Sequence, residues 1–232
     1  MCAIRNLMMQ IQEEDAETYI ASMVRCFAAP TLEGLKAGSL LTLSRPGEDV
    51  AAAWRRVESG LLRDFRVKAL ILREGEGKAL LLVYQENLLL EAVSDSKAQE
   101  LLSRQGYPPS LSLPTLLSHL QGRFDRQRSP GEDFPHEVGL FLGYPPEDVE
   151  GFIRDGGTGN LAVGYWKVYG NVKKARRAFR AFRRAERKAA RAMLAGTFSL
   201  SFLGSLSCTA ELEAQKHKKL WLPSGANNTG GF

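Results

Sequence analysis

Six residues in the second half of the chain have side chains that could bind or transform a ligand. They are His136, Glu137, Tyr144, Tyr165, Trp166 and Lys167. A histidine beside a carboxylate could act as acid and base on a substrate, and the aromatic residues around Lys167 could stack on a flat molecule. We therefore expect a binding or accessory module for a small molecule or a protein partner, with its ligand site around these residues. The sequence specifies neither a cofactor nor a reaction.

A catalytic pair is the first alternative to a binding role. His136 with Glu137 has the residue types of an acid–base pair, and Cys26 with His136 has those of a nucleophile and its base. Neighbouring residues of a strand point to opposite faces, which separates His136 from Glu137 if this segment is a strand. The spacing of Cys26 and His136 does not indicate proximity, and a free cysteine is commonly a small buried hydrophobe. Structural roles in a loop and in a core therefore explain these residues without catalysis.

A basic helix near residue 180 supports the second alternative, a binder of nucleic acid or of another anionic surface. Residues 173–191 contain ten Lys or Arg and one Glu, a net charge of +9 in a chain whose total is +5, so the rest of the chain sums to −4. Val172, Phe179 and Phe182 belong to an apolar stripe. The basic residues on the other faces could contact phosphates or, with the apolar run TFSLSFL that follows, an anionic membrane. A solvated helix face needs no partner. The candidate contacts are Lys173, Arg176, Arg177, Arg180, Arg184, Arg187 and Arg191.

Two loops resemble ligand-binding loops in composition. The glycine-rich segment 155–160 follows a predicted helix and precedes a predicted strand, which is the reverse of the order in a phosphate loop. The segment 143–151 lies between a predicted strand and a predicted helix, where α/β sheets often bind ligands. Glu147 and Asp148 in its first helical turn favour the positive end of the helix dipole and disfavour an anion. A cationic or neutral ligand fits this loop better, although helix capping alone explains both residues.

The elements that must position these residues follow from hydrophobic periodicity and turn residues. Gly75 and Gly77 predict a hairpin between two apolar runs. The expected class is α/β or α+β: one domain with a mixed sheet of about five strands, helices packed on it and the long basic helix at its C-terminal end. The predicted strands are 39–43, 67–72, 79–84, 138–142 and 162–169; the predicted helices are 12–27, 48–62, one or two within 86–104 with a break near 94–96, 113–124, one after 146, and the basic helix.

The length of 232 residues fits one domain with a tail. We expect a globular domain over residues 1–195 and a C-terminal extension over residues 196–232 that is partly disordered. Cys2, Cys26 and Cys208 form no close pair, which argues against a disulfide framework and against a metal site made of cysteine alone. The chain has no secretory signal pattern and no apolar run near the ~20 residues of a transmembrane helix. We therefore expect a cytoplasmic protein without a transmembrane segment.

Three blocks of the chain resemble one bacterial family, catalogued as domain of unknown function 3793. They are APTLEGLKAGSL at 29–40, FPHEVGLFLGYPPEDVEGFI at 134–153, and GYWKVYG at 164–170, which the basic helix follows. The resemblance extends over about residues 15–195 and implies no activity. Similar proteins often have a cysteine directly before the first Ala-Pro-Thr, where this chain has Ala28. A redox or nucleophilic role of such a cysteine is therefore not expected here.

Overall fold

The computed structural model describes residues 3–63, 65–109, 112–126 and 134–195. Helices predominate, and the five strands form two separate sheets. In chain order the elements are α1 (Ala3–Ile11), α2 (Ala16–Phe27), α3 (Ala29–Leu32), β1 (Gly38–Ser44), α4 (Val50–Arg63), β2 (Lys68–Gly75), β3 (Lys78–Tyr84), α5 (Glu86–Ser94), α6 (Ser96–Arg104), α7 (Leu113–Arg126), α8 (Val138–Phe141), α9 (Pro146–Arg154), β4 (Ala162–Val163), β5 (Lys167–Val168) and α10 (Val172–Leu194).

The larger sheet has three antiparallel strands in the order β1-β3-β2. The predicted hairpin is confirmed: Gly75 of β2 pairs with Lys78 of β3, and Gly77 in the turn has a φ of +62°. A Cβ at Gly77 would also lie 2.7 Å from the carbonyl oxygen of Arg45. Glycine is therefore required here both for the left-handed backbone and for the close approach of the loop after β1.

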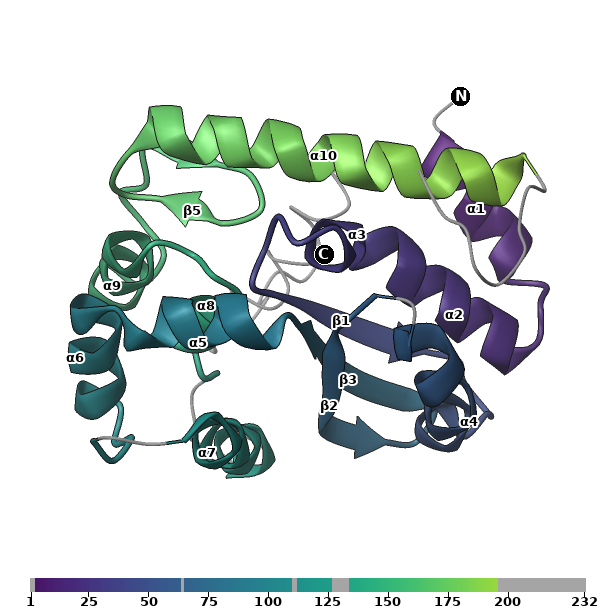
Figure 1. Cartoon of the computed structure of the whole chain (residues 1–232), viewed down its shortest axis with the longest axis horizontal. Helices are drawn as coiled ribbons and strands as arrows, with labels where there is room; N and C mark the ends of the chain where they lie inside the picture. The colour runs from purple at the N-terminus through teal and green to yellow at the C-terminus, as the bar shows by residue number, and fades with distance from the viewer. Residues whose placement is uncertain (1–2, 64, 110–111, 127–133, 196–232) are drawn as a thin grey trace, which may run out of the picture.

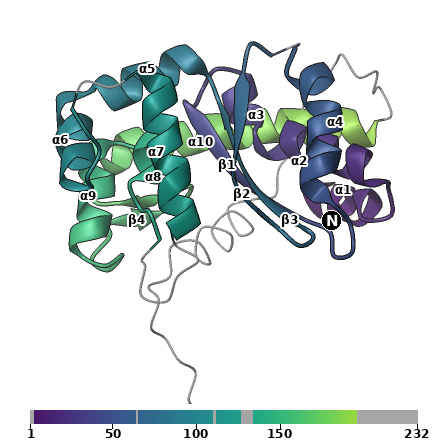
Figure 2. The same ribbon diagram turned by 90° about the horizontal axis from the view of Figure 1, so that it is seen from below.

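Two hydrophobic cores lie on opposite faces of this sheet. Side chains of β3 alternate between them, with Leu80 and Leu82 in one core and Leu81 and Val83 in the other. Helices α1, α2 and α4 cover one face, and α5 to α9 cover the other (Figures 1 and 2). Since both faces are covered, β3 is an almost continuous apolar run rather than an alternating one.

Helix α10 spans both halves of the molecule along the β1 side of the sheet (Figure 1). Phe179 and Phe182 near its beginning pack into the core that contains α5 to α9, whereas Ala190 near its end belongs to the core that contains α1 and α2. Asn171 caps its N-terminus by accepting a hydrogen bond from the backbone N–H of Lys174 at 2.9 Å. The predicted basic helix therefore packs against both cores and connects them.

The segment 138–142, predicted as a strand, forms the single-turn helix α8 instead. Val138, Gly139, Leu140 and Phe141 are all buried, so the run is apolar on every side. A short apolar run of this kind does not distinguish a buried strand from a buried helical turn. His136 and Glu137 therefore lie in the turn that opens α8 and not on a strand.

The segment 162–169, predicted as one strand, is a small hairpin of β4 and β5. The chain reverses at Gly164, whose N–H donates to the carbonyl oxygen of Trp166 at 3.0 Å. Tyr165 and Trp166 are consequently both buried at the tip of the hairpin. The α+β class and five strands are confirmed, with the strands divided between two antiparallel sheets rather than joined in one mixed sheet.

None of the described helices is long and apolar enough to cross a membrane. The predicted C-terminal extension, residues 196–232, and its TFSLSFL run lie outside the described residues.

Candidate functional site

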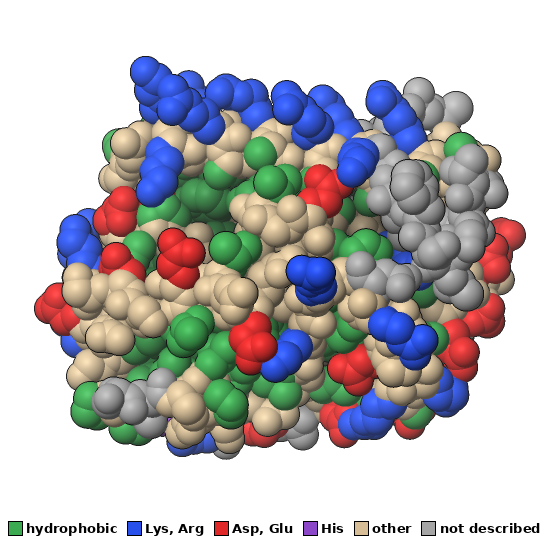
Figure 3. Space-filling view, in the orientation of Figure 1, with side chains coloured by type: hydrophobic (Ala, Val, Ile, Leu, Met, Phe, Trp, Pro, Cys, Tyr) green, Lys and Arg blue, Asp and Glu red, His purple; other side chains and the backbone are tan. Residues whose placement is uncertain are grey.

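A pocket of about 460 Å³ lies between α5 and α10. Its volume is within the range of about 300–1,000 Å³ typical of small-molecule sites. Figure 3 shows an apolar hollow directly below the row of basic side chains. Four parts of the chain line the pocket: the segment before β1 (Gly34, Leu35, Ala37), α5 and its end (Leu88, Glu91, Ala92, Asp95), the α8–α9 loop (Gly143 to Pro146), and Trp166 with α10 (Lys174, Ala175, Ala178, Phe182).

Tyr144 and Trp166 form an aromatic wall of this pocket. Their rings are stacked, with centroids 4.7 Å apart and an interplanar angle of 28°. The hydroxyl of Tyr144 donates to the carbonyl oxygen of Tyr165 at 3.2 Å, and the ring of Phe179 meets the indole of Trp166 edge-on at 4.6 Å. These contacts hold both rings in place, and only 3% of Tyr144 and 6% of Trp166 is exposed.

The charged side chains at the rim come from the two helices that flank the pocket. Glu91 and Asp95 lie at α5, and Lys174 lies on α10. Asp95 also caps α6, since its carboxylate accepts hydrogen bonds from the N–H groups of Lys97 and Ala98. The charged groups of the lining thus comprise two carboxylates and one ammonium group.

Lys36 lies behind the aromatic wall, in the segment that also provides Leu35 and Ala37 to the lining. Its side chain is buried, and its Nζ lies 5.4 Å from the ring centroid of Tyr144 and 6.0 Å from that of Tyr165. These are cation–π distances. The rings of Tyr144 and Tyr165 therefore already contact one ammonium group, that of Lys36.

Two of the predicted site residues, His136 and Glu137, lie away from the pocket lining. The imidazole of His136 packs between the rings of Phe134 and Phe152, at centroid distances of 5.4 and 4.9 Å. Glu137 is fully buried and accepts a hydrogen bond from Nε of Arg123 at 2.9 Å, within an ion pair. Both residues therefore have contacts that join α7, α8 and α9 in the core.

Lys167 and Tyr165 also have structural contacts outside the lining. The Nζ of Lys167 donates to the carbonyl oxygen of Gly157 and so anchors the glycine-rich loop. The hydroxyl of Tyr165 donates to buried Glu186 of α10 at 2.6 Å. Of the six predicted residues, the structure brings Tyr144 and Trp166 together at the pocket, with Tyr165 behind them.

Cys26 is buried in the core of α1, α2 and α4. His136 packs against Phe152, which belongs to the core on the other face of the sheet. The structure therefore does not bring this thiol and this imidazole together. Among the described residues, no group of three or more His, Cys, Asp or Glu side chains is arranged to hold a metal ion.

The predicted anion contacts on α10 all lie on its solvent-exposed side. Figure 3 shows them as a row of basic side chains along one edge of the molecule. The opposite side of the helix is buried, with Phe179 and Phe182 among its core residues. The exposed predicted residues are Lys173, Arg176, Arg177, Arg180, Arg184, Arg187 and Arg191.

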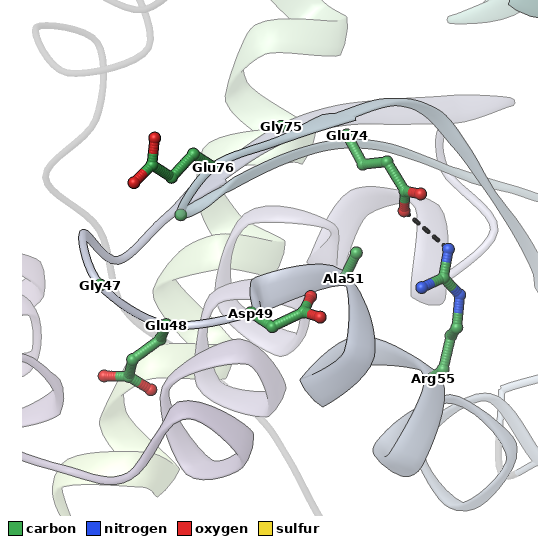
Figure 4. Close-up of a pocket in the computed structure, with 9 residues that line it drawn as sticks. Gly47, Glu48, Asp49, Ala51, Arg55, Glu74, Gly75 and Glu76 are labelled. Atoms are coloured by element: carbon green, nitrogen blue, oxygen red, sulfur yellow. Dashed lines mark hydrogen bonds and ion pairs between the residues drawn. The ribbon is translucent and has the colours of Figure 1, made fainter.

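A second hollow, of about 490 Å³, lies between the loop after β1 and the β2–β3 turn (Figure 4). Three of its four carboxylates, those of Glu48, Asp49 and Glu74, are engaged in the fold. Asp49 caps α4 through the N–H of Ala52 at 2.8 Å, and Glu74 pairs with Arg55 at 2.6 Å. An acidic cluster with such contacts is explained by loop and helix structure, so we do not assign a site here.

Several residues in or behind the wall of the pocket could not be identified from the sequence pattern. Lys36, Glu91 and Ala178 have no motif around them that points to a ligand. The one available signal for Lys36 is its position inside the first family-like block. Glu91 and Ala178 reach the pocket only because α5 and α10 lie across from each other.

The three family-like blocks, which are far apart in the sequence, meet at this pocket. Block 29–40 provides Gly34, Leu35 and Ala37, block 134–153 provides the Gly-Tyr-Pro-Pro loop, and block 164–170 provides Trp166. No curated protein and no solved structure matches the chain. The family model described as "Protein of unknown function (DUF3793)" matches residues 24–202. The chain therefore belongs to this family.

Proposed function

We propose that the protein is a binding module whose pocket between α5 and α10 takes a flat organic molecule with a positive charge. The observation that carries the proposal is the convergence of the three family-like blocks on this pocket. Residues of all three blocks also pack in the core that contains α5 to α9. A ligand in the pocket would contact side chains from each block.

The flat shape of the ligand is inferred from the aromatic wall. Trp166 stacks on Tyr144 and is held by a hydrogen bond from its Nε1 to Asp148 at 2.7 Å. A planar molecule would contact the small part of this stack that faces the pocket, 3% of Tyr144 and 6% of Trp166 being exposed. Pro145 and Pro146 at the adjoining edge add rigid apolar surface.

The positive charge of the ligand is inferred from the rim and from the π faces. Glu91 and Asp95 outnumber Lys174 at the rim, and a cation above an indole gains electrostatic attraction. An anionic ligand would meet two carboxylates beside Lys174, with the buried Lys36 behind the aromatic wall.

Calorimetric titration with three planar pyridines of different charge tests the proposal. The probes are 1-methylnicotinamide (cation), nicotinamide (neutral) and nicotinate (anion). We expect saturable binding that is tightest for the cation and weakest for the anion. The variant Ala178→Phe, which places a ring in the pocket without removing a polar contact, should abolish binding of all three.

Glu91→Gln is the charge variant, and Glu76→Gln at the distant β2–β3 turn is its matched control. Glu91→Gln should weaken binding of the cation by about two- to fivefold, the usual strength of one exposed charge pair, and should not affect nicotinamide. Glu76→Gln should change neither. Absence of binding by all three probes, or equal affinity for cation and anion, would contradict the proposal.

A further inference from the structure

Six basic side chains form one straight line on the solvent side of α10. Their five steps cover 18 residues, an average of 3.6 that equals the α-helical repeat. At a rise of about 1.5 Å per residue the line is about 27 Å long. All six side chains are exposed. We call this line the basic ridge; it consists of Lys173, Arg177, Arg180, Arg184, Arg187 and Arg191.

Much of the charge of the basic ridge is not neutralised within the fold. Beside the ridge, Lys188 pairs with Glu33 at 3.0 Å, and Arg187 has a contact of its own. In the part of the chain that the structure describes, the other five ridge residues have no carboxylate within ion-pair distance. Some exposed arginines elsewhere in the fold do have such a carboxylate partner, for example Arg56, which pairs with Glu17. The ridge is thus a concentrated positive field that a polyanion can meet.

The exposed side of α10 does not suit a lipid surface. A helix that lies in a membrane interface needs an exposed apolar face to insert. Every side chain that α10 exposes within its bounds is a Lys or an Arg, and its apolar side is packed against the two cores. Charge alone would then have to hold the protein on lipid.

A single nucleic-acid strand is also a poor match. Proteins that bind single strands combine a basic groove with exposed aromatic rings on which the bases stack. The aromatic residues of α10, Phe179 and Phe182, are buried under the helix. The ridge therefore offers contacts to phosphates and no platform for bases.

We propose that the basic ridge binds the phosphate backbone of duplex DNA, with α10 directed at the major groove. A helix with its side chains is about 10–12 Å wide, and the major groove of B-form DNA is about 12 Å wide. The major groove of an RNA duplex is too narrow for such an element. Since the ridge consists of cations alone, the binding depends on charge and not on base sequence.

Fluorescence anisotropy of the full chain with a labelled DNA duplex of about 20 base pairs tests this proposal. If four to six phosphates are neutralised, the slope of log K against log salt is about −4 to −5. Affinity should then fall on the order of 10²- to 10³-fold between 50 and 200 mM salt.

The double variant Arg180→Gln/Arg184→Gln removes two ridge charges. It should reduce the magnitude of the slope by about 2, since each phosphate contact contributes about 0.9. Arg55→Gln/Arg56→Gln, which removes two exposed charges from α4, is the matched control and should preserve the slope. Circular dichroism of each variant verifies that the fold is kept.

Four outcomes would overturn the proposal. They are a slope near zero, an equal loss of affinity in the α4 control, tighter binding of a single strand or an RNA duplex than of the DNA duplex, and tighter binding of phosphatidylserine vesicles. A steep slope that is reduced only by the ridge variant supports it.

Discussion

The indole Nε1–H of Trp166 donates a hydrogen bond to a carboxylate oxygen of Asp148 at 2.7 Å, and both groups are buried. The other oxygen of Asp148 accepts from the backbone N–H groups of Tyr169 and Gly170, each at 2.7 Å. One carboxylate at the start of α9 thus fixes the tip of the β4–β5 hairpin and the entry to α10. It also fixes the ring that forms a wall of the pocket.

Asp148→Asn should lower the free energy of unfolding by about 2–3 kcal/mol, because hydrogen bonds to a charged acceptor are stronger than neutral ones and one N–H loses its acceptor. Urea denaturation followed by circular dichroism measures this change. The near-ultraviolet signal of tryptophan should weaken in the folded variant as Trp166 loses its anchor. Glu147→Gln, one residue earlier and exposed, should leave both signals unchanged. Equal stability of Asp148→Asn and the wild type would refute this role.

Glu137 is expected to be essential for stability rather than for binding. It is buried in an ion pair with Arg123 and accepts a hydrogen bond from Tyr107 at 3.2 Å. Because a quarter of the Arg123 side chain is exposed, the cost should lie below that of a fully buried pair and amount to about 1.5–3 kcal/mol, the contribution of hydrogen bonds to a charged group. Glu137→Gln should therefore shift the urea midpoint strongly downward.

The control for Glu137 is Glu150→Gln, which breaks the exposed pair with Arg104. Exposed pairs contribute little, so its midpoint should stay near that of the wild type. If Glu137→Gln kept full stability and altered only the titrations with the pyridine probes, Glu137 would be a ligand residue after all.

Two glycine substitutions of the same size should have opposite effects. An ideal Cβ at Gly164 would lie 2.1 Å from the ring of Phe179, so Gly164→Ala should destabilise by about 1–3 kcal/mol through overpacking. A Cβ at Gly122, in α7, meets nothing within 4 Å. Gly122→Ala should therefore stabilise by about 0.5–1 kcal/mol, since alanine favours the helix. Thermal unfolding compares the two, and the wild-type packing is verified if Phe179→Leu partly rescues Gly164→Ala.

Elements with a strong periodic pattern or clear turn residues could be predicted from the sequence. The β2–β3 hairpin, α7 and α10 lie where the apolar spacing places them, and the chain breaks between α5 and α6 at Asp95 as expected. α8 could not be predicted, because a four-residue run that is buried on all sides has no period. The β4–β5 reversal could not be predicted, because it depends on the packing of Phe179, in the following helix α10, on Gly164.

The pocket itself depends on contacts between distant segments. Tyr144 and Trp166 were identified as candidates by their chemistry, and the stack between them arises from the α8–α9 loop meeting the hairpin tip. Asp148 was interpreted as a partner of the helix dipole, whereas its three N–H donors come from residues 18 to 22 positions later. A pattern confined to neighbouring residues contains no information about such a partner.

The stability of the protein should decrease as the pH falls below about 6.5, the unperturbed pKa of histidine, and His119 should account for part of the decrease. Burial lowers the pKa of His119, and the positive charges of Arg126 and Arg123 lower it further, against an opposing effect of Glu137. Because the folded pKa lies below the unfolded one, the unfolded chain binds the proton more readily. The contribution of neutral His119 to the free energy of unfolding is therefore fully present above the unfolded pKa and is lost as the pH falls towards the folded pKa.

Urea unfolding of the wild type and His119→Gln at several values between about pH 5 and 7.5 measures this contribution. The variant also loses the ring contact with Tyr107, whose centroid lies 4.3 Å from that of His119, so slopes and not absolute stabilities are compared. The slope of the free energy of unfolding against pH should be smaller in His119→Gln than in the wild type. Asp155→Asn is the control: the hydrogen bond and charge of Arg154 hold the pKa of Asp155 below its usual value, so this change acts only at lower pH. Identical slopes in the wild type and His119→Gln would show that protonation of His119 is not linked to unfolding.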